Sequence, residues 1–114
     1  MTIERIDPDT RWSEAVIHND TIYYTSVPEK LDGDIIEQTS DTLAAIDSLL
    51  YRLGSDKSKI LDATIFLADK ADFAGMNTAW DAWVVAGSAP VRCTVQAALM
   101  DPKYKVEIKI IAAL

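Results

Sequence analysis

Hydrophobic and polar residues alternate along the first part of the chain in the pattern of paired strands. The runs TIERI (2–6), EAVIH (14–18) and TIYYTS (21–26) are rich in β-branched and aromatic residues, which strands favour. Asn19 and Asp20 separate the second run from the third, and this pair suits a tight turn between antiparallel strands. The pattern therefore predicts a β-hairpin with a further strand before it.

The hydrophobic period changes to that of a helix after Asp34. Asp34 is placed to cap the start of this helix, and Gly54 readily adopts the left-handed conformation that ends one. The apolar stripe between them consists of Ile36, Leu43, Ile46, Leu50 and Leu53. A second helix is predicted to begin after Asp72, its expected cap, and to end before Gly87. Its apolar stripe consists of Phe73, Met76, Trp80 and Val84.

Three further strands are predicted in the second half of the chain. They are KILDATIFLAD (59–69), VRCTVQAALM (91–100) and YKVEIKIIAAL (104–114). The resulting order β-β-β-α-β-α-β-β describes a single domain over residues 1–114. It predicts an α+β fold in which a mixed six-stranded sheet carries both helices on one face. The other face would then need cover, which self-association can supply.

The charge balance argues against several classes of partner. Eleven basic residues stand against eighteen acidic ones, a formal net charge of −7, which repels phosphate backbones and anionic membrane surfaces. We therefore expect neither nucleic acid nor a membrane as a partner. The single cysteine cannot form an intrachain disulfide, and the opening MTIERIDPD lacks the apolar core of a secretory signal. These features predict a cytoplasmic protein.

One arginine is unusual because it lies near the start of an apolar predicted strand. Strand alternation places Arg92 on the same face as Thr94, opposite the apolar side chains. On the final strand, Glu107 also lies on a polar face, between Lys105 and Lys109. If the two strands pair, Glu107 comes close to Arg92, giving a cation that binds carboxylates beside a carboxyl group that handles protons. The alternative, favoured by spacing alone, is a solvated face on which these charges form weak cross-strand ion pairs.

Four segments of the chain resemble the Rid, or YjgF-like, reactive-intermediate deaminases. They are IYYTSVPE, ILDATIFLADKADFAGMNTAWDAWV, APVRCTV and KVEIKIIAAL, so the similarity runs essentially from end to end. The resemblance implies a chorismate-mutase-like α+β fold and a homotrimer whose sheets form a central barrel, with ligand clefts between subunits. It also implies hydrolysis of enamine and imine intermediates, such as 2-aminoacrylate, to 2-keto acids and ammonia. It implies no metal ion and no organic cofactor.

The same resemblance implies roles for two charged residues. The arginine at the position of Arg92 would hold the substrate carboxylate, and the glutamate at the position of Glu107 would position or activate water. This pair suits the chemistry, because an iminium carbon is already electrophilic and water needs only positioning and a proton acceptor. We therefore expect Arg92 and Glu107 to be catalytic and the partner to be a small-molecule carboxylate.

Four other residues are expected to border the substrate. Thr94 stands where many deaminating members carry a cysteine, and it can offer a hydroxyl or its backbone N–H. Cys93 is its neighbour, but alternation turns the thiol to the opposite face, where core packing is the favoured interpretation. Trp12 and Ser26 align where the family commonly has a tyrosine and a glycine. Both substitutions would alter the pocket.

A second hypothesis is a non-catalytic trimeric binding module. In this alternative the same cleft holds a 2-keto acid or a related small carboxylate, and the protein signals or buffers that acid. The departure at Thr94 motivates the hypothesis, because many deaminating members carry a cysteine there.

Overall fold

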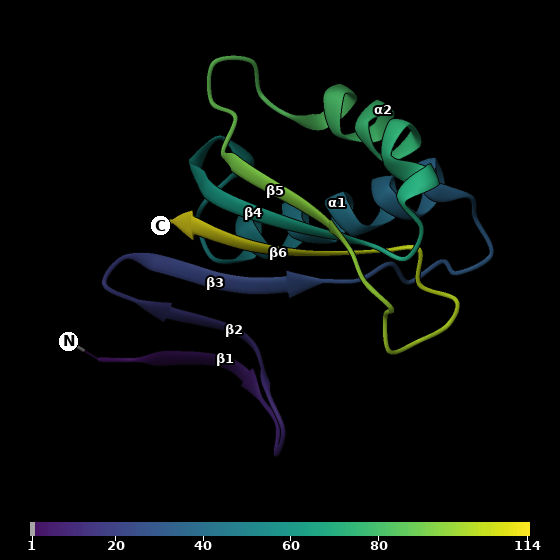
Figure 1. The fold of residues 1–114 in the computed structure, drawn as a ribbon. Helices are drawn as coiled ribbons and strands as arrows, with labels where there is room; N and C mark the ends of the chain where they lie inside the picture. The colour runs from purple at the N-terminus through teal and green to yellow at the C-terminus, as the bar shows by residue number, and fades with distance from the viewer. Residues whose placement is uncertain (1) are drawn as a thin grey trace.

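Six strands and two helices make up the protein in a computed structural model that describes residues 2–114 (Figure 1). Their order is the one predicted from the sequence. The strands are β1 Glu4–Pro8, β2 Ser13–His18, β3 Thr21–Ser26, β4 Ile60–Leu67, β5 Val91–Gln96 and β6 Val106–Ala113. The helices are α1 Ile35–Arg52 and α2 Phe73–Trp83, and the short 3-10 helices η1 Lys57–Lys59 and η2 Lys70–Asp72 precede β4 and α2.

The strands lie side by side in the order β1-β2-β3-β6-β4-β5. All neighbours run antiparallel except β4 and β5, which are parallel and are joined through α2. The sheet is therefore mixed, with β1 and β5 at its edges. Both helices lie on one side of it, α1 packing against α2, β3 and β6 (Figure 1). This arrangement confirms the predicted chorismate-mutase-like α+β fold.

Alternation along the central strands gives the sheet two different faces. In β4, the side chain of Ile65 is fully buried on the helix side, whereas those of Thr64 and Phe66 point to the other face and remain partly exposed. The buried residues of β6 are Val106, Ile108, Ile110 and Ala112. They form one core cluster with the apolar stripe of α1. Within residues 2–114 no helix covers the second face, as predicted, and we call it the uncovered face.

The two helices begin in different ways. Asp34 and Glu37 form a capping box at the start of α1, each side chain accepting a hydrogen bond from the other residue's backbone N–H. Gly54, with φ +85°, follows the end of α1 as predicted. Asp72 makes no capping hydrogen bond at α2, so that prediction is wrong. Because η2 leads directly into α2, Asp72 (φ −85°, ψ 3°) lacks the extended backbone of a capping residue.

Strand β5 is shorter than its apolar sequence suggests. The apolar run continues to Met100, but pairing with β4 ends at Gln96. The chain then leaves the sheet in a loop over residues 97–105, where Met100 is 92% exposed. Strand β5 is therefore an edge strand with a projecting loop after it.

Candidate functional site

Arg92 projects from β5 toward α2. It is paired with Ala63 of β4, whose side chain faces the helices, so Arg92 lies on the helix side of the sheet and is half-buried. The guanidinium carbon lies 5.3 Å from the centre of the Trp80 ring and 5.9 Å from that of Phe73, and Nη1 lies 4.0 Å from Sδ of Met76. No carboxylate in the described part of the chain forms an ion pair with it. The charge is therefore available to an anionic ligand.

Thr94 lies two residues further along the same face of β5. Its Oγ1 is buried and, among the described residues, has no hydrogen-bond partner. Leaving a buried hydroxyl unpaired costs about 1–3 kcal/mol. Thr94 also lines a depression of about 530 Å³ together with Leu67, Lys70 and Phe73. A ligand held by Arg92 would therefore have an unused hydrogen-bonding group beside it.

Glu107 lies on the opposite face of the sheet from Arg92. It pairs with Phe66 on the uncovered face, whereas Arg92 pairs with Ala63 on the helix side. The strands β5 and β6 do not pair, because β4 lies between them. The expectation that strand pairing brings Arg92 and Glu107 together is therefore wrong within one chain. The weak cross-strand ion pairs expected for a solvated face are also absent, because Glu107 forms no ion pair with a lysine among the described residues.

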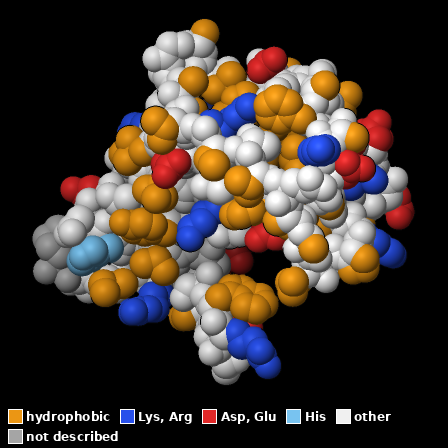
Figure 2. Space-filling view, viewed as in Figure 1, with side chains coloured by type: hydrophobic (Ala, Val, Ile, Leu, Met, Phe, Trp, Pro, Cys, Tyr) orange, Lys and Arg blue, Asp and Glu red, His pale blue; other side chains and the backbone are white. Residues whose placement is uncertain are grey.

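Glu107 shares a groove of about 690 Å³ with Trp12. The groove is the hollow between the far end of the β1–β2 hairpin and the loop after β5 (Figure 2). Trp12 is 68% exposed, and Tyr23 and Met100 also line the groove. Two predicted site residues, Glu107 and Trp12, thus line one groove, which neither Arg92 nor Thr94 lines.

Ser26 and Cys93 lie elsewhere than expected. Ser26 is 1% exposed on the helix side, where its hydroxyl donates a 2.9 Å hydrogen bond to the backbone carbonyl of Thr42. Thr25, rather than Ser26, lines the groove that contains Trp12. Cys93 is exposed on the uncovered face. Its interpretation as a core residue is therefore wrong within one chain, because no helix covers that face.

The loop bordering the groove is held by Gln38, a fully buried residue of α1 that we did not predict. Its Nε2 donates to the backbone carbonyls of Leu31 (3.1 Å) and Lys103 (2.9 Å). Its Oε1 accepts a 2.8 Å hydrogen bond from the backbone N–H of Lys105. The sequence signal for a residue that holds a loop in this way is a polar side chain at a position of α1 that faces the core.

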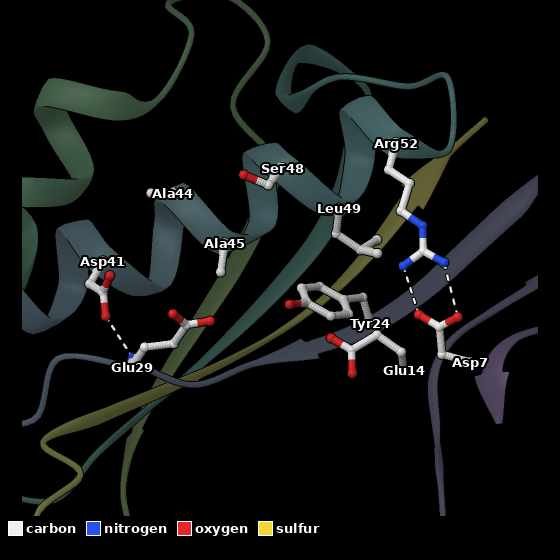
Figure 3. A pocket seen from close by; sticks show the side chains of 10 residues that line it. All are labelled: Asp7, Glu14, Tyr24, Glu29, Asp41, Ala44, Ala45, Ser48, Leu49 and Arg52. Atoms are coloured by element: carbon white, nitrogen blue, oxygen red, sulfur yellow. Dashed lines mark hydrogen bonds and ion pairs between the residues drawn. The ribbon is translucent and has the colours of Figure 1, made fainter. Parts of the chain in front are cut away.

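A second groove lies between α1 and the first three strands (Figure 3). Arg52 contacts Asp7 through two hydrogen bonds of 2.7 and 3.0 Å, which lower the pKa of the Asp7 carboxyl. Burial raises the pKa of the Tyr24 phenol, which lies in the same groove. The carboxylates that line it are Asp7, Glu14, Glu29 and Asp41. Because its one lining cation is already paired, this groove offers no anchor for a carboxylate ligand.

Residues 2–114 hold neither a metal-binding cluster nor a helix suited to cross a membrane. No three His, Cys, Asp or Glu side chains in this range are grouped so that they can hold a metal ion. Neither described helix combines the length and the apolar character needed to cross a membrane.

Comparisons with known proteins give closely related sequences over the whole chain. A family profile described as endoribonuclease L-PSP matches residues 2–114. The RutC family protein YoaB of Escherichia coli K12 is 73% identical over 114 residues, covering all of both chains. A RutC family protein of Haemophilus influenzae is 53% identical and covers 98% of each chain.

Solved structures show the same fold. A crystal structure from Salmonella typhimurium is 70% identical, covers 99% of this chain and 98% of its own, and has a TM-score of 0.93. A member of the YjgF protein family from Neisseria meningitidis is 48% identical, covers 99% of this chain and 95% of its own, and has a TM-score of 0.94.

More distant relatives carry the names of deaminases. Reactive Intermediate Deaminase A of Arabidopsis thaliana is 32% identical over 110 residues, which are 90% of this chain and 58% of that protein. A 2-iminobutanoate/2-iminopropanoate deaminase of Capra hircus is 29% identical over 108 residues, 89% of this chain and 78% of its own. With a profile match across residues 2–114 and these relatives, the chain belongs to the endoribonuclease L-PSP family, the family of the YjgF and Rid proteins.

Proposed function

We propose that the protein hydrolyses reactive enamine and imine intermediates of the 2-aminoacrylate type to 2-keto acids and ammonia. The observation that carries this proposal is the guanidinium of Arg92, which lies between aromatic rings on an edge strand and has no carboxylate partner among the described residues. Such a group is suited to hold the planar carboxylate of a small acid through two hydrogen bonds. The names of the distant deaminase relatives support the reaction class.

The reaction adds water across a C=N bond and then releases ammonia. An enamine such as 2-aminoacrylate first takes up a proton on its terminal carbon and becomes the iminium ion, which is the protonated imine. Water attacks the iminium carbon, and Glu107 accepts the proton that this water loses. The resulting carbinolamine transfers a proton to nitrogen and breaks its C–N bond, which leaves the 2-keto acid and ammonia. Arg92 holds the substrate carboxylate, and Thr94 donates a hydrogen bond to it.

This chemistry requires a second copy of the chain. Arg92 and Thr94 lie on the helix side of the edge strand β5, whereas Glu107 lies on the uncovered face and lines a groove with Trp12. We therefore propose a homotrimer in which neighbouring copies bring the two pairs to one cleft. The apolar side chains on the uncovered face support association, since Val91 there is 69% exposed and hydrophobic side chains gather across this view of the molecule (Figure 2).

The family description names an endoribonuclease, but RNA does not fit the charge of this chain. A net charge of −7 repels a phosphate backbone, and contacts to phosphates supply most of the non-specific affinity of nucleic-acid-binding proteins. We propose a small carboxylate as the partner instead, with neither RNA nor a membrane, no metal or organic cofactor, and a cytoplasmic location.

The proposal is tested by competition for 2-aminoacrylate generated in solution. An amino-acid dehydratase produces the enamine, semicarbazide traps the imine that forms from it, and the rate of this trapping is followed as the protein is added. We expect the protein to divert the imine from the trap, and Arg92→Ala to abolish this effect. Arg5→Ala removes an exposed guanidinium from β1 and is the matched control. Absence of competition at every wild-type concentration contradicts the proposal.

A non-catalytic module that binds 2-keto acids is the second candidate. The unpartnered hydroxyl of Thr94 favours it, because that group serves binding equally well and replaces the cysteine of many deaminating members. Calorimetry with 2-ketobutyrate separates the two candidates. Tight binding that depends on Arg92, together with no imine turnover, would support the module over the hydrolase.

A further inference from the structure

The surroundings of Arg92 differ from those of Arg52, which forms an ion pair. Arg52 gives its N–H groups to the carboxylate of Asp7. The guanidinium of Arg92 instead lies over the rings of Phe73 and Trp80, at 5.9 and 5.3 Å from their centres. An aromatic face attracts a cation without occupying its N–H groups. Arg92 is thus oriented while its donors remain free.

The side chains that surround the guanidinium of Arg92 come from one stripe of helix α2. Phe73, Met76 and Trp80 are three and then four residues apart, so they lie on one stripe of the helix, which faces Arg92. The sulfur of Met76 is the only side-chain acceptor that contacts the guanidinium among residues 2–114, and a thioether is a weak acceptor. A bound carboxylate would therefore meet no strong competitor for the N–H groups.

The two rings differ in how deeply they are buried. Trp80 is 5% exposed and belongs to the core, whereas Phe73 is 46% exposed at the first position of α2. Phe73 also lines the depression that contains Thr94. The ring of Phe73 can therefore be altered without opening the core, and it lies where a ligand bound to Arg92 and Thr94 would lie.

We propose that Phe73 and Trp80 are positioning residues that hold the guanidinium of Arg92 for the substrate carboxylate. This inference rests on the proposed function of Arg92 as the carboxylate anchor. A guanidinium that is already oriented loses less conformational freedom when the ligand binds, which strengthens binding. The rings touch no reacting atom, so they should affect the affinity for the carboxylate more than the rate of the chemical step.

The experiment compares Phe73→Leu with Phe73→Tyr. Leu keeps an apolar side chain but removes the ring, whereas Tyr keeps the ring. We expect Phe73→Leu to raise KM for the imine, and Kd for 2-ketobutyrate, about three- to fivefold with kcat nearly unchanged. We expect Phe73→Tyr to behave like wild type. Tyr51→Leu, which removes an 82% exposed ring from α1, is the matched control.

The outcomes separate this inference from the proposed function. If wild type neither hydrolyses the imine nor binds 2-ketobutyrate, or if Arg92→Ala changes neither property, the proposed function fails and the inference fails with it. If Arg92→Ala weakens binding but Phe73→Leu leaves KM and Kd unchanged, only the inference is overturned. It is also overturned if Phe73→Tyr is as impaired as Phe73→Leu, because the ring is then not responsible.

Discussion

Arg92 and Glu107 project from opposite faces of the same sheet, and β4 lies between the strands that carry them. Under the proposed reaction both residues must reach one substrate, and a single chain does not allow this. Each cleft must then combine Arg92 of one copy with Glu107 of another. The location of these two side chains therefore makes the oligomer part of the mechanism and not only a source of stability.

Mixing two inactive variants should restore activity. Arg92→Ala and Glu107→Gln each remove one half of the cleft, so each variant alone should lack imine turnover. In mixed trimers formed by co-expression, about a quarter of the clefts should combine an intact Arg92 with an intact Glu107 from the neighbouring copy. The competition assay measures this recovery. If both residues of a cleft came from one chain, the mixture would stay inactive.

A charge placed on the uncovered face should weaken the assembly. Val91 is 69% exposed there, and burying an unpaired carboxylate between copies is costly. We expect Val91→Glu to lower the mass in sedimentation equilibrium and to reduce imine turnover in parallel. Tyr51→Glu places the same charge on an 82% exposed position of α1 and should change neither quantity. A wild-type monomer that hydrolyses the imine would contradict the two-copy cleft.

The fold was predictable because its signals are local. The period along α1, its cap at Asp34 and its end at Gly54 depend on residues within a few positions of one another. Alternation likewise assigned Arg92 and Thr94 to one face of β5. The face of β6 that meets the helices was also predictable, because Val106, Ile108 and Ile110 make that face apolar.

Strand order and the final surroundings of the site residues were not predictable in the same way. The placement of β4 between β5 and β6 is set by packing across the whole domain, and no residue near Glu107 signals it. Ser26 was expected in the cleft because it aligns with a glycine of the family, but its hydroxyl bonds to the backbone of α1. The apolar stripe of β5 predicted burial of Cys93, but that stripe lies on the uncovered face.

Replacing Gln38 should loosen the loop that borders the groove. Gln38→Met keeps the length of the side chain but leaves the backbone carbonyls of Leu31 and Lys103 without their donor. We expect a loss of about 2–4 kcal/mol in the free energy of unfolding, measured by urea denaturation. The backbone N–H of Lys105 should also exchange faster with solvent deuterium. Gln96→Met, at an exposed position of β5, is the control.

The contact between Asp7 and Arg52 should make stability depend on pH in the acid range. The pairing lowers the pKa of Asp7 below its ordinary value of 3.8. The folded protein therefore binds the proton less readily than the unfolded chain, so the contribution is present above pH 3.8 and is lost as the pH falls through the lowered value. Both side chains are largely exposed, which keeps the contribution small and sensitive to salt.

Asp7→Asn is the variant that isolates this contribution, because asparagine tolerates the left-handed backbone of this position (φ +46°). Urea unfolding at low ionic strength should show wild type to be slightly more stable than Asp7→Asn at neutral pH, with the difference shrinking as the pH falls below 3.8. Asp20→Asn changes another aspartate with positive φ (+56°), one that forms no ion pair among the described residues, and is the matched control. A difference between wild type and Asp7→Asn that stays constant, or that grows as the pH falls, would show that the ion pair does not stabilise the fold.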